Sequence, residues 1–164
     1  MKKELIIMIG LPGSGKSVFV DKKYSETYQV VCTDDVRKAL GFIFERKMEP
    51  LVHCISETIV KAKMERGLPI IIDETNIRSS HLLKWKNLAE EYEYKTTAII
   101  MDTNIDECKK RRKCNEGKFP EEVIDRMNIS LEHLKLDSLD FYFDKVLVYK
   151  DTTLKLKNEE QVNG

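Results

Sequence analysis

The sequence has no apolar run of the roughly 18 consecutive residues that a membrane-spanning helix requires. It also has no net charge, because 28 lysines and arginines are balanced by 28 aspartates and glutamates. These absences exclude a membrane-spanning helix within these residues and a uniformly basic coat for nucleic acid, but not a local basic cluster. The 164 residues are 41% hydrophobic and 34% charged, a composition that indicates one folded domain and not a disordered segment.

Metal-binding patterns of cysteine and histidine are absent as well. The four cysteines, Cys32, Cys54, Cys108 and Cys114, form no C-x-x-C pair, and the three histidines are scattered without ligand spacing. Because nothing in the sequence suggests secretion, we expect reduced thiols and a location in the cytoplasm. No feature predicts a protein partner.

Apolar runs of strand length alternate with stretches of helical periodicity along the chain. This alternation predicts an α/β fold, with a five-stranded parallel sheet and helices on both faces. Residues 1–150 would form this domain, and residues 151–164 would form a polar C-terminal tail. The motifs described below indicate that the domain is a P-loop kinase domain with a basic lid at about 105–119. The expected strands are residues 4–9, 29–33, 69–73, 95–101 and 144–149.

A glycine-rich motif follows the first expected strand. Residues 10–17 read G-L-P-G-S-G-K-S and match the phosphate-binding pattern G-x-x-x-x-G-K-[ST], which arises only rarely as a chance glycine turn. Glycines let backbone N–H groups turn toward an anion, and the next helix directs its positive end to the same point. Lys16 would contact the β and γ phosphates of a nucleotide, and the Ser17 hydroxyl would bind Mg²⁺. The residues expected to hold the nucleotide are Gly10, Pro12, Gly13, Ser14, Gly15, Lys16 and Ser17.

Three isoleucines followed by acids end the third expected strand. An acid at this place, Asp73, would hold a metal-bound water, although an ordinary turn-capping aspartate has the same appearance. Glu74 is adjacent and could share or take this role. Thr75 and Asn76 could line an acceptor pocket, and a plain polar turn is the equal alternative.

Charged residues also follow the second expected strand, where residues 32–37 read C-T-D-D-V-R. A kinase needs a carboxylate that accepts or orients the proton of the acceptor hydroxyl, and Asp34 is the first candidate and Asp35 the second. Arg37 lies three residues after Asp34 and shares its helix face, where it could hold an anionic acceptor. Helix capping by Asp34, with Arg37 simply exposed, is the alternative.

The strongest charge run is K-K-R-R-K at residues 109–113. Such a run is usually a solvated helix face, and five adjacent cations cannot all point one way. It follows the fourth expected strand, however, where a nucleotide kinase places a mobile lid. Arg111 or Arg112 would there neutralise the transferring phosphoryl group.

Together these motifs resemble the kinase module of phage-type polynucleotide 5′-kinases and their small P-loop relatives. The resemblance extends from about residue 4 to residue 150, and it implies that Asp34 is the general base for a 5′-hydroxyl. It also implies that Arg37 contacts the phosphate of the acceptor's terminal nucleotide and that a lid arginine contacts the donor phosphates. The motifs that carry it are GLPGSGKS (10–17), TDDVRKAL (33–40), IIDETN (71–76), the basic run (109–113) and FPEEVIDRM (119–127).

The resemblance implies a kinase that uses ATP and Mg²⁺ to phosphorylate the 5′-OH ends of DNA or RNA. Two alternatives stay open at this point. One is a P-loop kinase of a small-molecule hydroxyl, such as a nucleoside, sugar or antibiotic, and the other is a nucleotide-binding regulatory module. No D-x-D-G-T motif is present, so no 3′-phosphatase module is expected in these residues.

Overall fold

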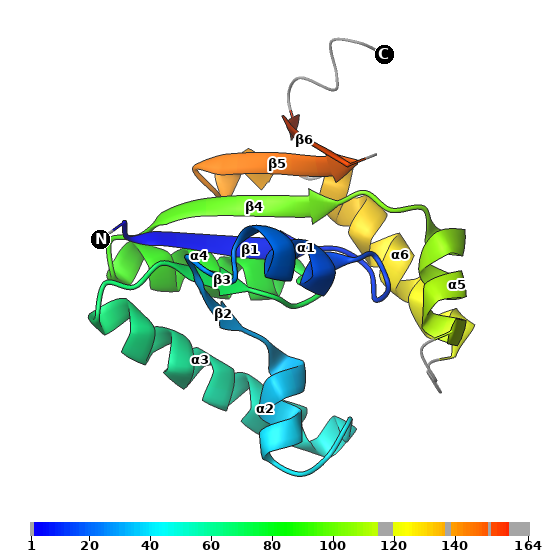
Figure 1. The fold of residues 1–164 in the computed structure, drawn as a ribbon, viewed down its shortest axis with the longest axis horizontal. Helices are drawn as coiled ribbons and strands as arrows, with labels where there is room; N and C mark the ends of the chain where they lie inside the picture. Colours follow the sequence, from blue (N-terminus) through cyan, green and yellow to red (C-terminus); the bar gives the residue numbers. More distant parts are fainter. Residues whose placement is uncertain (1, 115–119, 137–138, 151, 158–164) are drawn as a thin grey trace.

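A computed structural model of the chain describes residues 2–114, 120–136, 139–150 and 152–157 (Figure 1). The strands are β1 (Glu4–Ile9), β2 (Gln29–Val31), β3 (Ile70–Ile72), β4 (Lys95–Met101), β5 (Lys145–Lys150) and β6 (Thr153–Leu156). The helices are α1 (Lys16–Lys23), α2 (Thr33–Ala39), α3 (Glu49–Glu65), α4 (Ser79–Glu91), α5 (Ile105–Cys114) and α6 (Glu121–Leu136), with 3₁₀ turns η1 (Arg46–Met48) and η2 (Leu139–Phe141).

The strands form one sheet in the order β2-β3-β1-β4-β5-β6. The first five are parallel to their neighbours, and β1 lies at the centre, with Ile6 opposite Ile71 of β3 and Thr97 of β4. The predicted α/β fold with a parallel sheet is therefore confirmed. Because β1 and β3 are covered on both faces, they are apolar nearly throughout, as central parallel strands are.

The sheet has a sixth strand, which the sequence pattern did not predict. After β5 the chain reverses through Thr152, whose φ of 65° is left-handed, and β6 pairs antiparallel with β5. The four residues of β6 read T-L-K-L, so polar and apolar residues alternate, but the segment is short and three of its four residues are exposed, which makes it resemble the polar tail expected there. The pairing is supplied by the open edge of β5, which is a tertiary feature.

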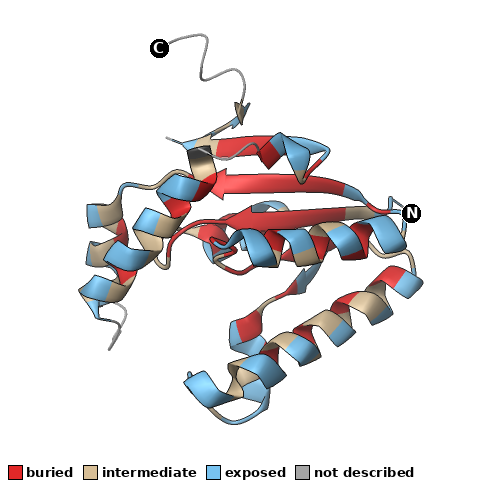
Figure 2. Cartoon of the chain, turned by 180° about the vertical axis from the view of Figure 1, so that it is seen from behind, coloured by how far each residue is buried: buried red, intermediate tan, exposed pale blue. Residues whose placement is uncertain are grey.

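Alternate residues of β1 divide the core between the two faces of the sheet, since successive strand side chains point to opposite sides. Leu5, Ile7 and Ile9 join a large apolar cluster with α3, α4 and α6, whereas Ile6 and Met8 join a smaller one with α1. Figure 2 shows that the buried residues lie along the strands and on the helix faces that point toward the sheet. Helices on both faces are thus confirmed, and each buried aliphatic side chain contributes about 1.5–3 kcal/mol.

The parallel strands end on the side of the sheet where α5 lies, and α2 begins at the same edge (Figure 1). Strand β1 continues there into residues 10–17, β2 into α2, and β3 into residues 73–76. This edge therefore collects the polar motifs that the sequence places after separate strands.

No helix in the described ranges is long and apolar enough to cross a membrane. Cys32, Cys54 and Cys108 form no disulfide among the described residues, and their reduced state stays a prediction. The expected location in the cytoplasm stays a prediction.

Candidate active site

The phosphate loop, residues 10–17, depends on glycine for its curvature. Gly13 and Gly15 adopt φ values of 82° and 93°, the left-handed region that other residues rarely enter. A Cβ on Gly13 would also lie only 2.6 Å from the carbonyl oxygen of Cys108 in α5. Any side chain at this position would thus push α5 away from the loop.

The ammonium group of Lys16 lies buried inside this loop. Its Nζ donates hydrogen bonds to the carbonyl oxygens of Gly10 at 3.0 Å and Leu11 at 2.8 Å, and a longer one to Ser14 Oγ at 3.4 Å. Burial lowers the pKa of Lys16 to about 8, against the opposing charge of Asp73. Phosphate oxygens would give this cation acceptors that carry a full charge, so the loop fits a bound nucleotide.

Ser17 and Asp73 are brought together across the loop. The carboxylate of Asp73 is buried, which raises its pKa, and the nearby Ser17 hydroxyl opposes this shift by stabilising the ionised form. A hydroxyl and a carboxylate beside a phosphate site fit Mg²⁺, which takes few protein oxygens and keeps water or phosphate as its other ligands. In the described part of the chain, no group of three or more His, Cys, Asp or Glu side chains is arranged for a metal.

Glu74, the alternative acid, has a different environment from Asp73. Its side chain is buried, and its Oε1 atom has no hydrogen-bond partner among the described residues. Burial raises the pKa of Glu74 to about 7, although the charges of Lys84 and Arg37 oppose this shift. The geometry thus places Asp73, and not Glu74, next to Ser17.

Asn76 is fully buried, and both ends of its side-chain amide are hydrogen-bonded within the protein. Its Nδ2 donates to the carbonyl oxygen of Met8 at 2.9 Å, and its Oδ1 accepts from Trp85 Nε1 at 3.2 Å. The amide ties the turn after β3 to β1 and α4, so the prediction that Asn76 contacts an acceptor does not fit its position. Thr75 is half-buried, and its carbonyl oxygen accepts from the backbone N–H of Gly10 at 3.0 Å.

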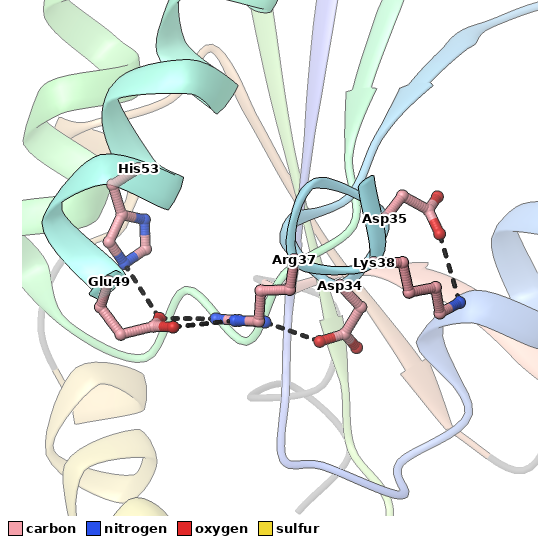
Figure 3. A network of polar contacts seen from close by, with 6 residues as sticks. All are labelled: Asp34, Asp35, Arg37, Lys38, Glu49 and His53. Carbon is pink, nitrogen blue, oxygen red and sulfur yellow. Dashed lines mark hydrogen bonds and ion pairs between the residues drawn. The ribbon is translucent and has the colours of Figure 1, made fainter. Parts of the chain in front are cut away.

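On the acceptor side, Arg37 lies between two carboxylates (Figure 3). Its Nη1 donates to Asp34 Oδ1 at 2.6 Å. Its Nε and Nη2 donate to the two carboxylate oxygens of Glu49, at 2.9 and 2.6 Å. Hydrogen bonding to Glu49 raises the pKa of Arg37, so the guanidinium stays charged. The side chain of Arg37 is only 12% exposed, whereas that of Asp34 is 73% exposed. A partly buried cation therefore holds an accessible carboxylate in one orientation.

Glu49 is a site residue that the sequence reasoning missed. Glu49 is the first residue of α3 and precedes Pro50. In the sequence it therefore looks like any acid in the first turn of a helix. Its partner Arg37 lies 12 residues earlier on α2, and the pairing exists because α2 packs against α3. No local periodicity links the two positions.

Asp35 is not part of this network. Its carboxylate lies away from Arg37 and pairs at 3.4 Å with Lys38 on the exposed side of α2 (Figure 3). Of the two acids predicted as acceptor residues, only Asp34 is held by Arg37. The helix periodicity explains this, because residues three apart share a face and adjacent residues do not.

The predicted lid arginines lie against the phosphate loop. Arg111 Nη1 donates to the Gly13 carbonyl at 3.3 Å and lies 3.4 Å from where a Cβ on Gly15 would be. The Cγ of Arg112 lies 3.1 Å from the corresponding position on Gly13. Arg111 also pairs with Glu107 one helical turn earlier, at 2.9 Å. Both arginines thus come from α5 to the site where donor phosphates are expected.

Two of the three lysines in the same run contact α6 instead of the phosphate loop. Lys109 pairs with Asp125 at 2.7 Å, and Lys113 pairs with Glu121, so both join α5 to α6. This agrees with the expectation that part of the basic run would not face the nucleotide. Residues 115–119 of the predicted lid lie outside the described residues.

The rings of His53 and His81 lie beside the acceptor network, and their centroids are 5.4 Å apart. Burial lowers the pKa of His81 to about 4, and the charges of His53, Lys84 and Arg78 act in the same direction. In the unfolded chain the pKa is near 6.5, so folded His81 binds fewer protons between these values. Stability from this group is complete above pH 6.5 and is lost as the pH falls toward 4.

We therefore expect His81→Gln to reduce the loss of stability that the protein shows as the pH falls. Its free energy of unfolding should fall less than that of the wild type between pH 7 and pH 4, by about 1–2 kcal/mol, because water still reaches part of the ring. Urea titrations at each pH measure this difference. His133→Gln, a change at an exposed histidine of α6, is the control and should leave the profile unchanged. Parallel profiles for wild type and His81→Gln would contradict the assignment.

Comparisons with known proteins place the chain in a family. The model of the AAA domain family (AAA_33) matches residues 5–134. A protein of Acanthamoeba polyphaga mimivirus, named as a bifunctional polynucleotide phosphatase/kinase, is 32% identical over 162 residues, covering 90% of this chain and 35% of the viral protein. The L-seryl-tRNA(Sec) kinase of Methanococcus maripaludis is 27% identical over 165 residues, covering 97% of this chain and 63% of the relative.

A solved structure shows the same likeness. A chain in the structure of the Pnkp1/Rnl/Hen1 RNA repair complex superposes with a TM-score of 0.72 at 27% identity, covering 82% of this chain and 45% of that one. This chain thus spans from about one third to just under two thirds of the length of these relatives. Because the family match includes the phosphate loop, Asp34 and the buried Asp73, the protein belongs to the AAA domain family and has the fold of a P-loop kinase.

Proposed function

We propose that this chain is an ATP-dependent polynucleotide 5′-hydroxyl kinase, which transfers the γ-phosphoryl group of ATP to the 5′-OH of DNA or RNA. The observation that carries the proposal is the exposed carboxylate of Asp34, fixed by the Arg37–Glu49 pair at the strand edge that also holds the phosphate loop. Transfer to an alcohol needs a carboxylate that accepts or orients the hydroxyl proton. The name of the mimivirus relative supports a polynucleotide as the acceptor.

On the donor side, the backbone of the phosphate loop and Lys16 would bind the triphosphate. Ser17 and Asp73 would hold Mg²⁺, which supplies positive charge to the phosphates when bound. Arg111 would approach the same phosphates from α5 and stabilise the charge that spreads over the transferring group. These groups position the donor and neutralise it, which is most of what phosphoryl transfer asks of a protein.

On the acceptor side, Asp34 would accept the hydroxyl proton at its carboxylate. Arg37 holds that carboxylate through Nη1 and keeps its own orientation through Glu49. The phosphate contact that the family resemblance implies for Arg37 would have to share or replace the contact with Glu49. Arg37 is therefore a positioning residue for Asp34 in the present arrangement.

One labelling experiment tests the proposal directly. The protein is incubated with γ-labelled ATP and Mg²⁺, together with 5′-OH DNA and RNA oligonucleotides, seryl-tRNA, nucleosides and sugars in parallel. We expect label on the oligonucleotides, with a KM that rises with salt because bound counterions are released when the protein contacts phosphates. Label on a nucleoside or sugar alone, with a KM insensitive to salt, would contradict the proposal.

A second candidate function is phosphorylation of a hydroxyl carried by tRNA. It is favoured by the match to L-seryl-tRNA(Sec) kinase, which covers 97% of this chain. The same Asp34 carboxylate would serve this acceptor, since the chemistry at the hydroxyl is identical. Label that appears on seryl-tRNA and not on the oligonucleotides would assign the chain to this function.

A further inference from the structure

The segment that joins α2 to η1 exposes large apolar side chains beside the acceptor network. Ile43 is 90% exposed and Phe44 is 63% exposed, and Leu40 at the end of α2 is also exposed. Single exposed apolar residues are common on protein surfaces, whereas adjacent ones beside the proposed acceptor carboxylate mark a candidate interaction site. This group, Leu40, Ile43 and Phe44, is called the apolar rim below.

Phe44 is connected to the acceptor carboxylate through one side chain. The Cζ atom of Arg37 lies 5.7 Å from the centre of the Phe44 ring, within the range of a cation–π contact. The same guanidinium donates to Asp34 Oδ1 at 2.6 Å. An acceptor whose hydroxyl reaches Asp34 would thus have an exposed aromatic ring close to the rest of its first nucleotides.

The charges around the rim favour an anionic occupant. Arg46 and Lys47 follow directly in η1 and are exposed, and the single acid among them, Glu45, pairs loosely with Lys47 at 3.8 Å. Exposed aromatic rings flanked by cations are the pattern by which proteins bind single-stranded nucleic acid, with bases stacked on the rings and phosphates near the cations. Three apolar side chains on a connecting segment offer much less than the roughly 800 Å² per partner of a stable protein interface.

We propose that Phe44 is the stacking platform for a base in the first two nucleotides of a single-stranded acceptor. This inference rests on the proposed function and narrows it, because it makes the enzyme selective for strands over isolated sugars or base-less ends. Stacking is tolerant of sequence, since every base has a flat aromatic face. Arg37 would then contact both groups that meet the acceptor, the carboxylate of Asp34 and the ring of Phe44.

The test compares Phe44→Ala and Phe44→Trp with the wild type on two strands. One is a short single-stranded 5′-OH oligonucleotide, and the other is the same strand without the bases of its first two nucleotides. We expect Phe44→Ala to raise the KM for the intact strand by roughly 5- to 150-fold and to leave the KM for ATP unchanged. Phe44→Trp should retain a low KM. Phe141→Ala, which removes an even more exposed ring on η2, should behave like the wild type.

The strand without bases separates stacking from a structural effect. On that strand the wild type and Phe44→Ala should have the same raised KM, because no base is present to stack. An equal loss in Phe44→Ala on both strands would show that the ring only supports Arg37, and would overturn the proposal. An unchanged KM on the intact strand would also overturn it, and self-association lost in Phe44→Ala would then assign the rim to a protein contact.

A binding measurement distinguishes this inference from the proposed function. In Phe44→Trp, quenching of the introduced indole by the intact oligonucleotide reports stacking without any phosphoryl transfer. Quenching in a protein that labels no oligonucleotide would retain the binding site and reject the kinase function. Labelling without quenching, and without a KM effect in Phe44→Ala, would retain the kinase and reject the stacking site.

Discussion

Replacing Asp34 with asparagine is expected to lower kcat for the acceptor by roughly 10²–10⁴-fold, while the affinity for ATP stays unchanged. Asparagine keeps the size of the side chain and can still accept a hydrogen bond from Arg37, but it cannot take a proton from the hydroxyl. Because the Arg37–Glu49 pair is independent of Asp34, the orientation of α2 against α3 should persist. Steady-state kinetics with a labelled oligonucleotide, together with nucleotide titration, measures both quantities.

Asp35→Asn is the matched control for this change. Both aspartates are 73% exposed, both lie in the first turn of α2, and each pairs with a cation three residues later. They differ in that only Asp34 is held by the partly buried Arg37. We expect Asp35→Asn to keep most of the activity, and equal losses in the two variants would remove Asp34 as the specific proton acceptor.

Replacing Arg111 with alanine is expected to give a larger loss, roughly 10³–10⁵-fold in kcat, which is the usual contribution of an arginine that contacts a transferring phosphoryl group. Its Nη1 lies over the loop, near the carbonyl of Gly13 and the Cα of Gly15, and its side chain is half-exposed. Arg111→Lys should recover only part of the rate, because an ammonium group lacks the two-pronged geometry of guanidinium. Single-turnover rates with saturating ATP separate this effect from binding.

Variants of Arg112 and Lys110, on the same helix α5, are the comparisons for Arg111→Ala. The stem of Arg112 packs against Gly13, so Arg112→Ala should loosen α5 on the phosphate loop and raise the KM for ATP more than it lowers kcat. Lys110 is exposed on the same helix, and Lys110→Ala removes the same charge with little expected effect on kcat. A larger kcat loss in Arg112→Ala than in Arg111→Ala would exchange the two assignments.

Much of this protein was determined by local sequence. The phosphate loop needs glycines at fixed places because glycine adopts the left-handed conformations of Gly13 and Gly15 without the strain that a side chain brings, so its pattern is visible without any tertiary information. The alternation of apolar strands and amphipathic helices fixed the parallel sheet, whose strand ends share one edge. For that reason the sequence alone predicts that Lys16, Ser17 and Asp73 lie near one another.

Tertiary structure decided the details that local patterns do not carry. Glu49 meets Arg37 only because α2 packs on α3, and Asn76 is removed from the acceptor side only because Met8 and Trp85 occupy its amide. Strand β6 forms because the edge of β5 offers unpaired backbone groups to a four-residue segment that is too short and too exposed to stand out as a strand in the sequence. The physical reason is common to all three: a local pattern records the preference of a residue, whereas its partner is chosen by segments that the fold brings together.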